Sequence, residues 1–87
     1  MDKFPCLRIA YEVARGGGSS PSVLNAANEE AVRAYLSGEL PFVKIPTLIE
    51  KVLSKHKKVE EPTLEEILAE DQWARDEAHR LLEAVFV

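Results

Sequence analysis

The sequence has little of what many protein classes require, and each shortage excludes one of them. Among its 87 residues there is one cysteine, Cys6, so an intrachain disulfide is impossible and a reducing, cytoplasmic compartment is expected. No apolar run approaches the roughly 20 residues that a membrane-spanning helix needs. The net charge of −4 offers no basic surface for nucleic acid. We therefore expect a single small domain with neither a membrane nor a nucleic-acid partner.

Ligands for metals and cofactors are also scarce. Cys6, His56 and His79 are scattered along the chain and lack the paired spacing of a zinc site. The glycines at 16–18 precede a helical segment, but neither dinucleotide-binding nor P-loop spacing is present. A connector between two helices is the favoured interpretation of these glycines. The sequence predicts no catalytic, metal-binding or cofactor-binding residue in this chain.

What the sequence does contain is apolar residues at helical spacing, with no credible strand alternation. Four helical segments are predicted, from about residue 5 to 15, from 21 to 37, from 45 or 47 to a polar connector at 54–62, and from 64 to 85. Glycines follow the first two segments, at positions where a left-handed cap favours glycine. Residues 1–87 are thus predicted to form one all-α domain, a small four-helix bundle.

The segment "GELPFVKIP", residues 38–46, interrupts this pattern between the second and third helices. Two prolines five residues apart disfavour regular helix and sheet pairing. Leu40, Phe42, Val43 and Ile45 make the segment too apolar for a solvated loop. It is predicted to be an irregular extended cover packed against the bundle, and Phe42 is a candidate interface residue.

The first and last helices each carry a predicted buried stripe. In the first helix the stripe consists of Leu7, Ala10, Tyr11 and Ala14. In the last it consists of Leu64, Ile67, Leu68, Asp71, Ala74, Ala78, Leu81, Leu82 and Val85. Trp73 falls opposite this second stripe, so it is predicted to lie at the surface, either half-covered by long side chains or as an anchor for another chain.

Two pairs of polar residues in and before the last helix have structural interpretations. "TLEE" fits a capping box in which Thr63 and Glu66 bond each other's backbone amides. Asp71 interrupts the apolar stripe, but Arg75 lies one turn later in the favourable acid-before-base order. We expect an intrahelical ion pair there rather than a catalytic carboxylate.

Asn28 is the most unusual residue of the second helix. It shares a face with Leu24, Ala27, Ala31 and Tyr35, so an amide is placed in an apolar stripe. It is either a catalytic or ligand-binding group or a buried structural amide. Because the 38–46 segment has backbone groups that no helix satisfies, we favour a buried amide that ties this segment to the bundle.

Three stretches resemble a known family in order and spacing. "FPCLRIAYEVARGGG", "SVLNAANEEAVRAYLSGELPFVKIPTLIEKVL" and "TLEEILAEDQWARDEA" are similar to the C-terminal helical domain of 1-deoxy-D-xylulose 5-phosphate reductoisomerase. The resemblance implies a parent oxidoreductase and isomerase that uses NADPH and a divalent metal, Mg or Mn. That enzyme makes 2-C-methyl-D-erythritol 4-phosphate for isoprenoid biosynthesis. The family's NADPH, metal and substrate sites precede the matched region, so none of their residues carries over to this chain.

Three functional hypotheses follow. The leading one is a non-catalytic domain that supports the catalytic domain of the parent enzyme by packing, and that is inactive alone. The alternative is an autonomous helical module that binds another protein, and the third is a small enzyme using Asn28 and Glu29. Apolar surface around Phe42 and the C-terminal "AVFV" would favour weak self-association. The sequence leaves open whether the chain is an excised fragment or a separate gene product.

Overall fold

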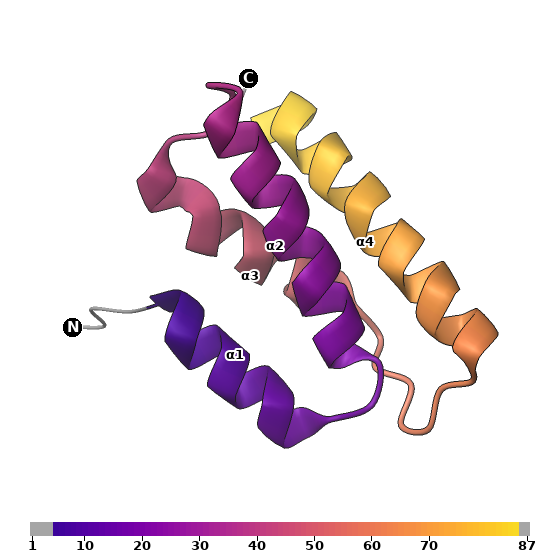
Figure 1. Cartoon of the computed structure of the whole chain (residues 1–87). Coiled ribbons are helices and arrows are strands. Elements are labelled where there is room, and N and C mark those ends of the chain that lie inside the picture. Colours follow the sequence, from indigo (N-terminus) through magenta and orange to yellow (C-terminus); the bar gives the residue numbers. More distant parts are fainter. Residues whose placement is uncertain (1–4, 86–87) are drawn as a thin grey trace.

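The computed structural model describes the backbone of residues 5–85 and the side chains of residues 8–84. Its elements are α1 (Pro5–Gly16), α2 (Ser20–Leu36), the short 3-10 helix η1 (Phe42–Lys44), α3 (Ile45–Lys55) and α4 (Leu64–Val85) (Figure 1). No strand occurs among residues 5–85, so the predicted all-α fold with four helices is confirmed. The predictions for the side chains of Cys6, Leu7 and residues 85–87 lie outside this description.

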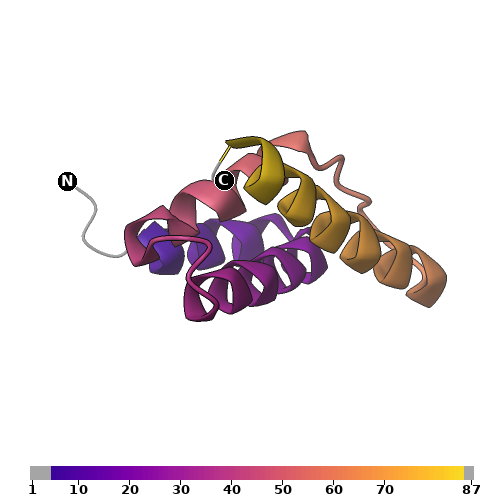
Figure 2. The same ribbon diagram turned by 90° about the horizontal axis from the view of Figure 1, so that it is seen from above.

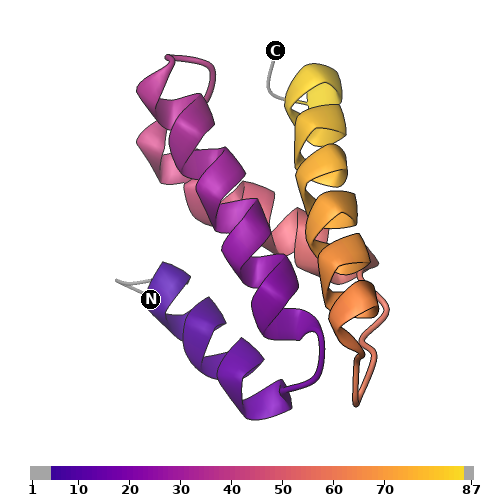
Figure 3. The same ribbon diagram turned by 45° about the vertical axis from the view of Figure 1, so that its right-hand side comes forward.

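Helix α2 is the centre of the arrangement and contacts each of the other three helices. Figure 1 shows it between α1 and α4 and in front of α3, and Figure 3 shows α3 crossing behind it toward α4. The molecule is a thin slab with extents of 36 × 29 × 18 Å (Figure 2). With neighbours on both flanks and behind, α2 keeps one side that no helix covers.

Small residues allow the helices to approach closely. Four alanines of α2 and two of α4 are fully buried, and a helix face without long side chains brings backbones together. Larger apolar residues from α3 and from the C-terminal end of α4 fill the remaining space. The buried apolar core consists of Ile9, Val23, Ala26, Ala27, Ala31, Ala34, Leu40, Ile45, Leu48, Ile49, Val52, Ala74, Ala78, Leu81 and Leu82.

The segment between α2 and α3 only partly fits its prediction as an extended cover. Leu40 and Ile45 are buried and seal the end of the bundle. Phe42 and Val43, which were also expected to pack, are 66% and 76% exposed. Pro41 has extended backbone, and η1 then forms one helical turn that leads directly into α3.

The stripe predicted for α1 is on the wrong face. Ile9 is buried and Val13 is partly buried against the core, whereas Ala10, Tyr11 and Ala14 are exposed. Both faces of α1 carry apolar residues at helical spacing, so periodicity alone cannot choose between them. The contacts with α2 and α3 select the face that holds Ile9 and Val13.

The stripe predicted for α4 is confirmed in its second half and wrong at its start. Four of its members, Ala74, Ala78, Leu81 and Leu82, are buried as predicted, whereas Leu64 and Leu68 at its start are 71% and 62% exposed. Because α4 contacts both α2 and α3, its covered arc is wide. Trp73 is therefore partly buried against the core, and its placement opposite the covered face was wrong.

Candidate functional site

Asn28 is exposed, so its prediction as a buried amide is wrong. Among residues 8–84 no hydrogen-bond partner faces its amide. The backbone amides of Glu39 and Leu40, which it was expected to satisfy, instead donate to the carbonyl of Ala34 over 2.8 and 3.2 Å. The free carbonyls at the end of α2 thus supply what the sequence argument assigned to Asn28.

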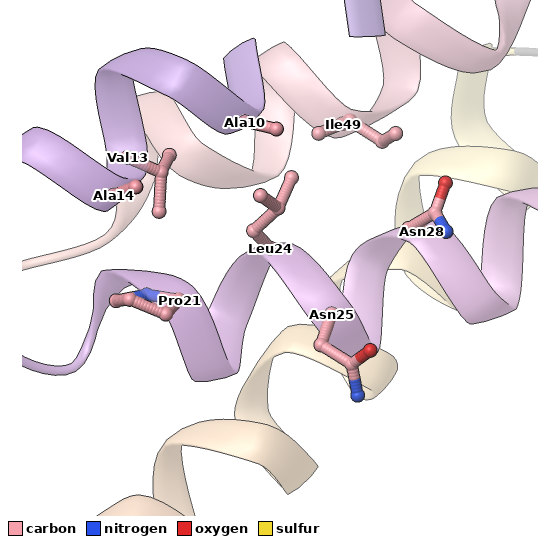
Figure 4. Close-up of a pocket in the computed structure, with 8 residues that line it drawn as sticks. All are labelled: Ala10, Val13, Ala14, Pro21, Leu24, Asn25, Asn28 and Ile49. Atoms are coloured by element: carbon pink, nitrogen blue, oxygen red, sulfur yellow. The ribbon is translucent and has the colours of Figure 1, made fainter. Parts of the chain in front are cut away.

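A hollow of about 410 Å³ lies between α1 and α2 (Figure 4). In Figure 4, Leu24 points from α2 toward α1, and Asn28 stands at one end of the hollow. Eight residues line it: Ala10, Val13, Ala14, Pro21, Leu24, Asn25, Asn28 and Ile49. None of these side chains ionises, so the hollow offers apolar contact and two amides but no acid, base or nucleophile.

A second, shallower hollow of about 390 Å³ continues along α2. Asn28 and Val32 line it, as does Leu36, whose side chain is 76% exposed. At the same end of α2 the rings of Tyr35 and Phe42 meet edge to face, with centroids 5.4 Å apart. Asn28 borders both hollows, so together they follow one uncovered side of α2.

The opposite side of α2 is joined to α4 through a buried carboxylate. Glu30 is 7% exposed and accepts hydrogen bonds from Arg33, from Arg75 Nη1 at 2.9 Å and from His79 Nε2 at 2.5 Å. Burial alone would raise the pKa of Glu30, but the hydrogen bonds from Arg33, His79 and Arg75 outweigh it and lower the pKa to about 2. The carboxylate is thus ionised and fully partnered, which suits it to holding two helices together.

Asp71 and Arg75 form the intrahelical ion pair that the sequence predicts, with Arg75 Nε 2.8 Å from Asp71 Oδ2. The same guanidinium also reaches α2, where its Nη2 lies 3.0 Å from Glu29 Oε1 and its Nη1 bonds Glu30. Arg75 is therefore a bridge between helices as well as a partner within α4. Sequence reasoning missed Glu30, although its position beside Ala26 and Ala27 marks it as an acid on a buried face.

A serine, a histidine and a carboxylate come together at the other end of the bundle. Ser19 Oγ lies 2.9 Å from His56 Nε2, and His56 Nδ1 lies 3.3 Å from Glu70 Oε2 without hydrogen-bond geometry. The order is that of a hydrolase triad, but Ser19 is 1% exposed, which leaves no access for a substrate. Its hydroxyl also accepts the Val59 amide at 2.8 Å, while the Ser19 amide donates to the Val59 carbonyl at 2.9 Å. This group is a structural clasp between two connectors.

Gly18 explains why the clasp can close. Its φ is +63°, and a β-carbon at this position would lie 2.4 Å from the carbonyl oxygen of Val59. Only glycine tolerates both that conformation and that approach. The predicted connector between two helices, with glycine in the left-handed conformation, is thus confirmed, but nothing in the spacing of Ser19, His56 and Val59 indicated that they would meet.

The remaining site predictions fall at separate places. Thr63 and Glu66 form both hydrogen bonds of the capping box, over 3.0 and 3.1 Å. Trp73 lies beside His56, with ring centroids 5.8 Å apart, whereas Phe42 lies beside Tyr35. These residues cap and join helices and do not converge on one reactive centre.

The described side chains do not fit the metal or the dinucleotide that the family resemblance implies. No group of three His, Cys, Asp or Glu residues within them could hold a metal ion. The larger hollow has no cation or glycine-rich loop to face a phosphate. In the part of the chain that the structure describes, no helix is both long and apolar enough to span a bilayer.

Comparison with known proteins gives consistent matches. The family model for the DXP reductoisomerase C-terminal domain matches residues 1–77. The 1-deoxy-D-xylulose 5-phosphate reductoisomerases of Exiguobacterium sibiricum and Thermodesulfovibrio yellowstonii are 50% and 52% identical over 86% and 88% of this chain, which covers 20% of each relative. The solved Zymomonas mobilis reductoisomerase in complex with NADPH matches with a TM-score of 0.87 and 39% identity, over 94% of this chain and 22% of that one. The chain therefore spans about a fifth of the length of these relatives.

Proposed function

The chain belongs to the DXP reductoisomerase C-terminal domain family, and from this premise we propose that it is a non-catalytic domain that supports the catalytic part of such an enzyme by packing against it. The parent activity proposed is the NADPH-dependent formation of 2-C-methyl-D-erythritol 4-phosphate in isoprenoid biosynthesis, in the cytoplasm. The observation that carries the proposal is the short span of the chain: about four fifths of each relative lies outside the match.

Two features of the site support a role in packing rather than in chemistry. The larger hollow is lined only by apolar residues and two amides, so it lacks the titratable groups of an active site. The buried titratable group that is most perturbed, Glu30, is fully engaged with Arg33, Arg75 and His79. NADPH and the Mg or Mn ion are accordingly assigned to the rest of the parent enzyme.

The test is reconstitution. The Thermodesulfovibrio yellowstonii reductoisomerase would be prepared without the part that matches this chain, and NADPH oxidation would be followed as the chain is titrated in. We expect saturable recovery of turnover, and no turnover from the chain alone. Leu48→Asp places a charge at a fully buried position and serves as the unfolded control. Absence of both recovery and binding would refute the proposal.

An autonomous interaction module is the second candidate. Leu36 and Val43, each 76% exposed, would serve an unrelated partner or a second copy of the chain equally well. Weak self-association is therefore proposed for the isolated chain. Sedimentation over a wide concentration range measures it, and a chain that associates only with itself favours this second candidate.

A further inference from the structure

We propose that the free face of α2, defined as Asn25, Asn28, Val32 and Leu36, is the surface on which the rest of the reductoisomerase polypeptide docks. This inference rests on the proposed function and adds to it the face that makes the contact. The occupant is a segment of the preceding polypeptide that inserts an apolar side chain between α1 and α2 and lays its backbone along Asn28.

The four residues form one stripe. At 100° per residue their positions span about 80° of the helix circumference, so they point in nearly the same direction. All four are exposed. In Figure 1, α1 and α4 flank α2 and α3 lies behind it, so one side of α2 is left without a covering helix.

The hollow beside this stripe suits an inserted apolar side chain. Its α1 wall consists of Ala10, Val13 and Ala14, whose small or branched side chains leave about 410 Å³ above Leu24 (Figure 4). Burying apolar surface is the main favourable contribution to docking between domains. Ala10 and Ala14, which sequence periodicity assigned to the core, are thus apolar for contact with another part of the enzyme.

Asn28 supplies the polar half of the surface. Its amide has no partner among residues 8–84, and it borders the hollows on both sides. A side-chain amide donates and accepts, so it can pair with the N–H and C=O groups of an irregular segment. Covering Asn28 without such partners would be unfavourable, which restricts the occupant to one that brings backbone or polar groups to this point.

The outer surfaces of α3 and of the middle of α4 are more polar, while Tyr11 of α1 and Leu64 and Leu68 at the start of α4 are isolated exposed apolar side chains. The exposed residues of α3 are Glu50, Lys51, Ser54 and Lys55. On the side of α4 turned away from α2, Gln72 bonds Asp76 and Arg80 bonds Glu77. Charged surface of this kind favours contact with water over a packed interface. The free face of α2 therefore fits the remaining four fifths of the enzyme better than these charged surfaces do, and the two hollows beside it, which Tyr11, Leu64 and Leu68 do not line, set it apart from those residues.

Cysteine footprinting tests the location directly. In a Cys6→Ser background, Leu36→Cys probes the free face, and Ala69→Cys is the matched control on the exposed outer side of α4. Maleimide labelling rates are compared between the isolated chain at low concentration and a fusion. In the fusion the chain replaces the matching part of the Geobacillus kaustophilus relative, which is 51% identical over 82 residues.

We expect the fusion to slow labelling of Leu36→Cys at least about tenfold while Ala69→Cys stays within about twofold, because thiol reactivity follows access. Protection of Ala69→Cys without Leu36→Cys would place the contact elsewhere, overturning this inference and leaving the proposed function intact. Protection of neither residue would overturn this inference, whereas the proposed function is overturned only if the reconstitution also fails. Equal protection of Leu36→Cys in the isolated chain at high concentration would identify a second copy as the occupant, which also overturns the inference.

Aspartate substitutions at the same two positions test the proposal independently, through binding. Leu36→Asp and Ala69→Asp each replace an exposed apolar side chain, so circular dichroism should show both variants folded. In the titration against the truncated relative, Leu36→Asp is expected to weaken binding about tenfold or more and Ala69→Asp less than about twofold. Equal binding of wild type and Leu36→Asp would contradict the assignment.

Discussion

The two sides of α2 differ in how closely they are packed. Toward α4, alanines allow close approach and Glu30 is bonded by three side chains from the two helices. Toward α1, the helices stand apart around a hollow, and Asn28 has no partner in the described residues. The difference indicates that the α4 side holds the bundle together and that the α1 side is shaped for something outside it.

The largest effect on stability is expected from adding side-chain volume on the α4 side. The same change on the α1 side is the comparison. Ala78→Leu inserts three carbons where the side chain is fully buried against the core, and should destabilise the fold by about 3 kcal/mol, the upper part of the range for overpacking. Ala14→Leu adds the same volume at the exposed hollow and should change stability by less than about 0.5 kcal/mol. Urea unfolding of both variants makes the comparison. Similar losses for the two would mean that the sides are equally packed.

Acid should weaken the closed side selectively. The pKa of Glu30 is about 2 when folded and 4.5 for an unperturbed glutamate, so its contribution is complete above about pH 4.5 and is lost as pH falls toward 2. We expect a loss of about 2 kcal/mol, below the full linkage value because Arg33 and His79 are about half exposed and solvent screens them.

The control for this prediction is Glu30→Gln, which keeps the shape of the side chain but cannot titrate. The difference in unfolding free energy between wild type and Glu30→Gln should shrink as pH falls from about 4.5 to about 2, because Glu30 becomes protonated. The other carboxylates are common to both proteins, so their titration cancels in this difference. Chemical unfolding at several pH values measures it. Parallel pH profiles for the two proteins would show that Glu30 is not the group responsible.

A smaller effect is expected where α4 begins. Thr63→Ala removes one of the two capping hydrogen bonds with Glu66 and should cost about 1 kcal/mol. Thr47→Ala, in the first turn of α3, is a matched change in a threonine that makes no side-chain hydrogen bond in the described part of the chain. Thermal unfolding compares them. An equal loss for both threonines would assign the effect to the methyl and hydroxyl groups in general rather than to the cap.

The smallest effect is expected at Asn28. Because its amide is exposed and unpartnered, Asn28→Leu should change the stability of the isolated chain by less than about 0.5 kcal/mol. Denaturant unfolding of the chain alone measures this, and the unchanged midpoint would contrast with the losses on the α4 side. A loss of more than about 1 kcal/mol would mean that the amide is bonded within the domain after all.

Local signals in this sequence were sufficient to predict the helices and where they begin and end. Proline at the start of α1, the glycines after α1 and α2, and the reciprocal bonds of Thr63 and Glu66 depend on neighbouring residues only. The pair of Asp71 and Arg75 was likewise predictable because one helical turn separates them. Each of these features is decided before the helices pack.

The choice of buried face could not be predicted in the same way. Tyr11, Leu64 and Leu68 have the spacing of core residues yet are 64%, 71% and 62% exposed. Helical periodicity shows that a face is apolar but not what covers it, and a domain from a larger enzyme has apolar faces for two kinds of neighbour. Asn28 was misassigned for the same reason, because its apolar surroundings were taken as evidence of burial within this chain.

The clasp between Ser19 and Val59 also bears on the order of folding. It joins residues 40 positions apart and closes the stretch of chain that contains α2 and α3. Closing a long loop costs conformational entropy before the contact compensates for it. We therefore expect α2 and α3 to pair first and the two connectors to lock last. Hydrogen exchange of the backbone amides of residues 19 and 59 should therefore show that the connectors open at a lower free energy than the helices unfold.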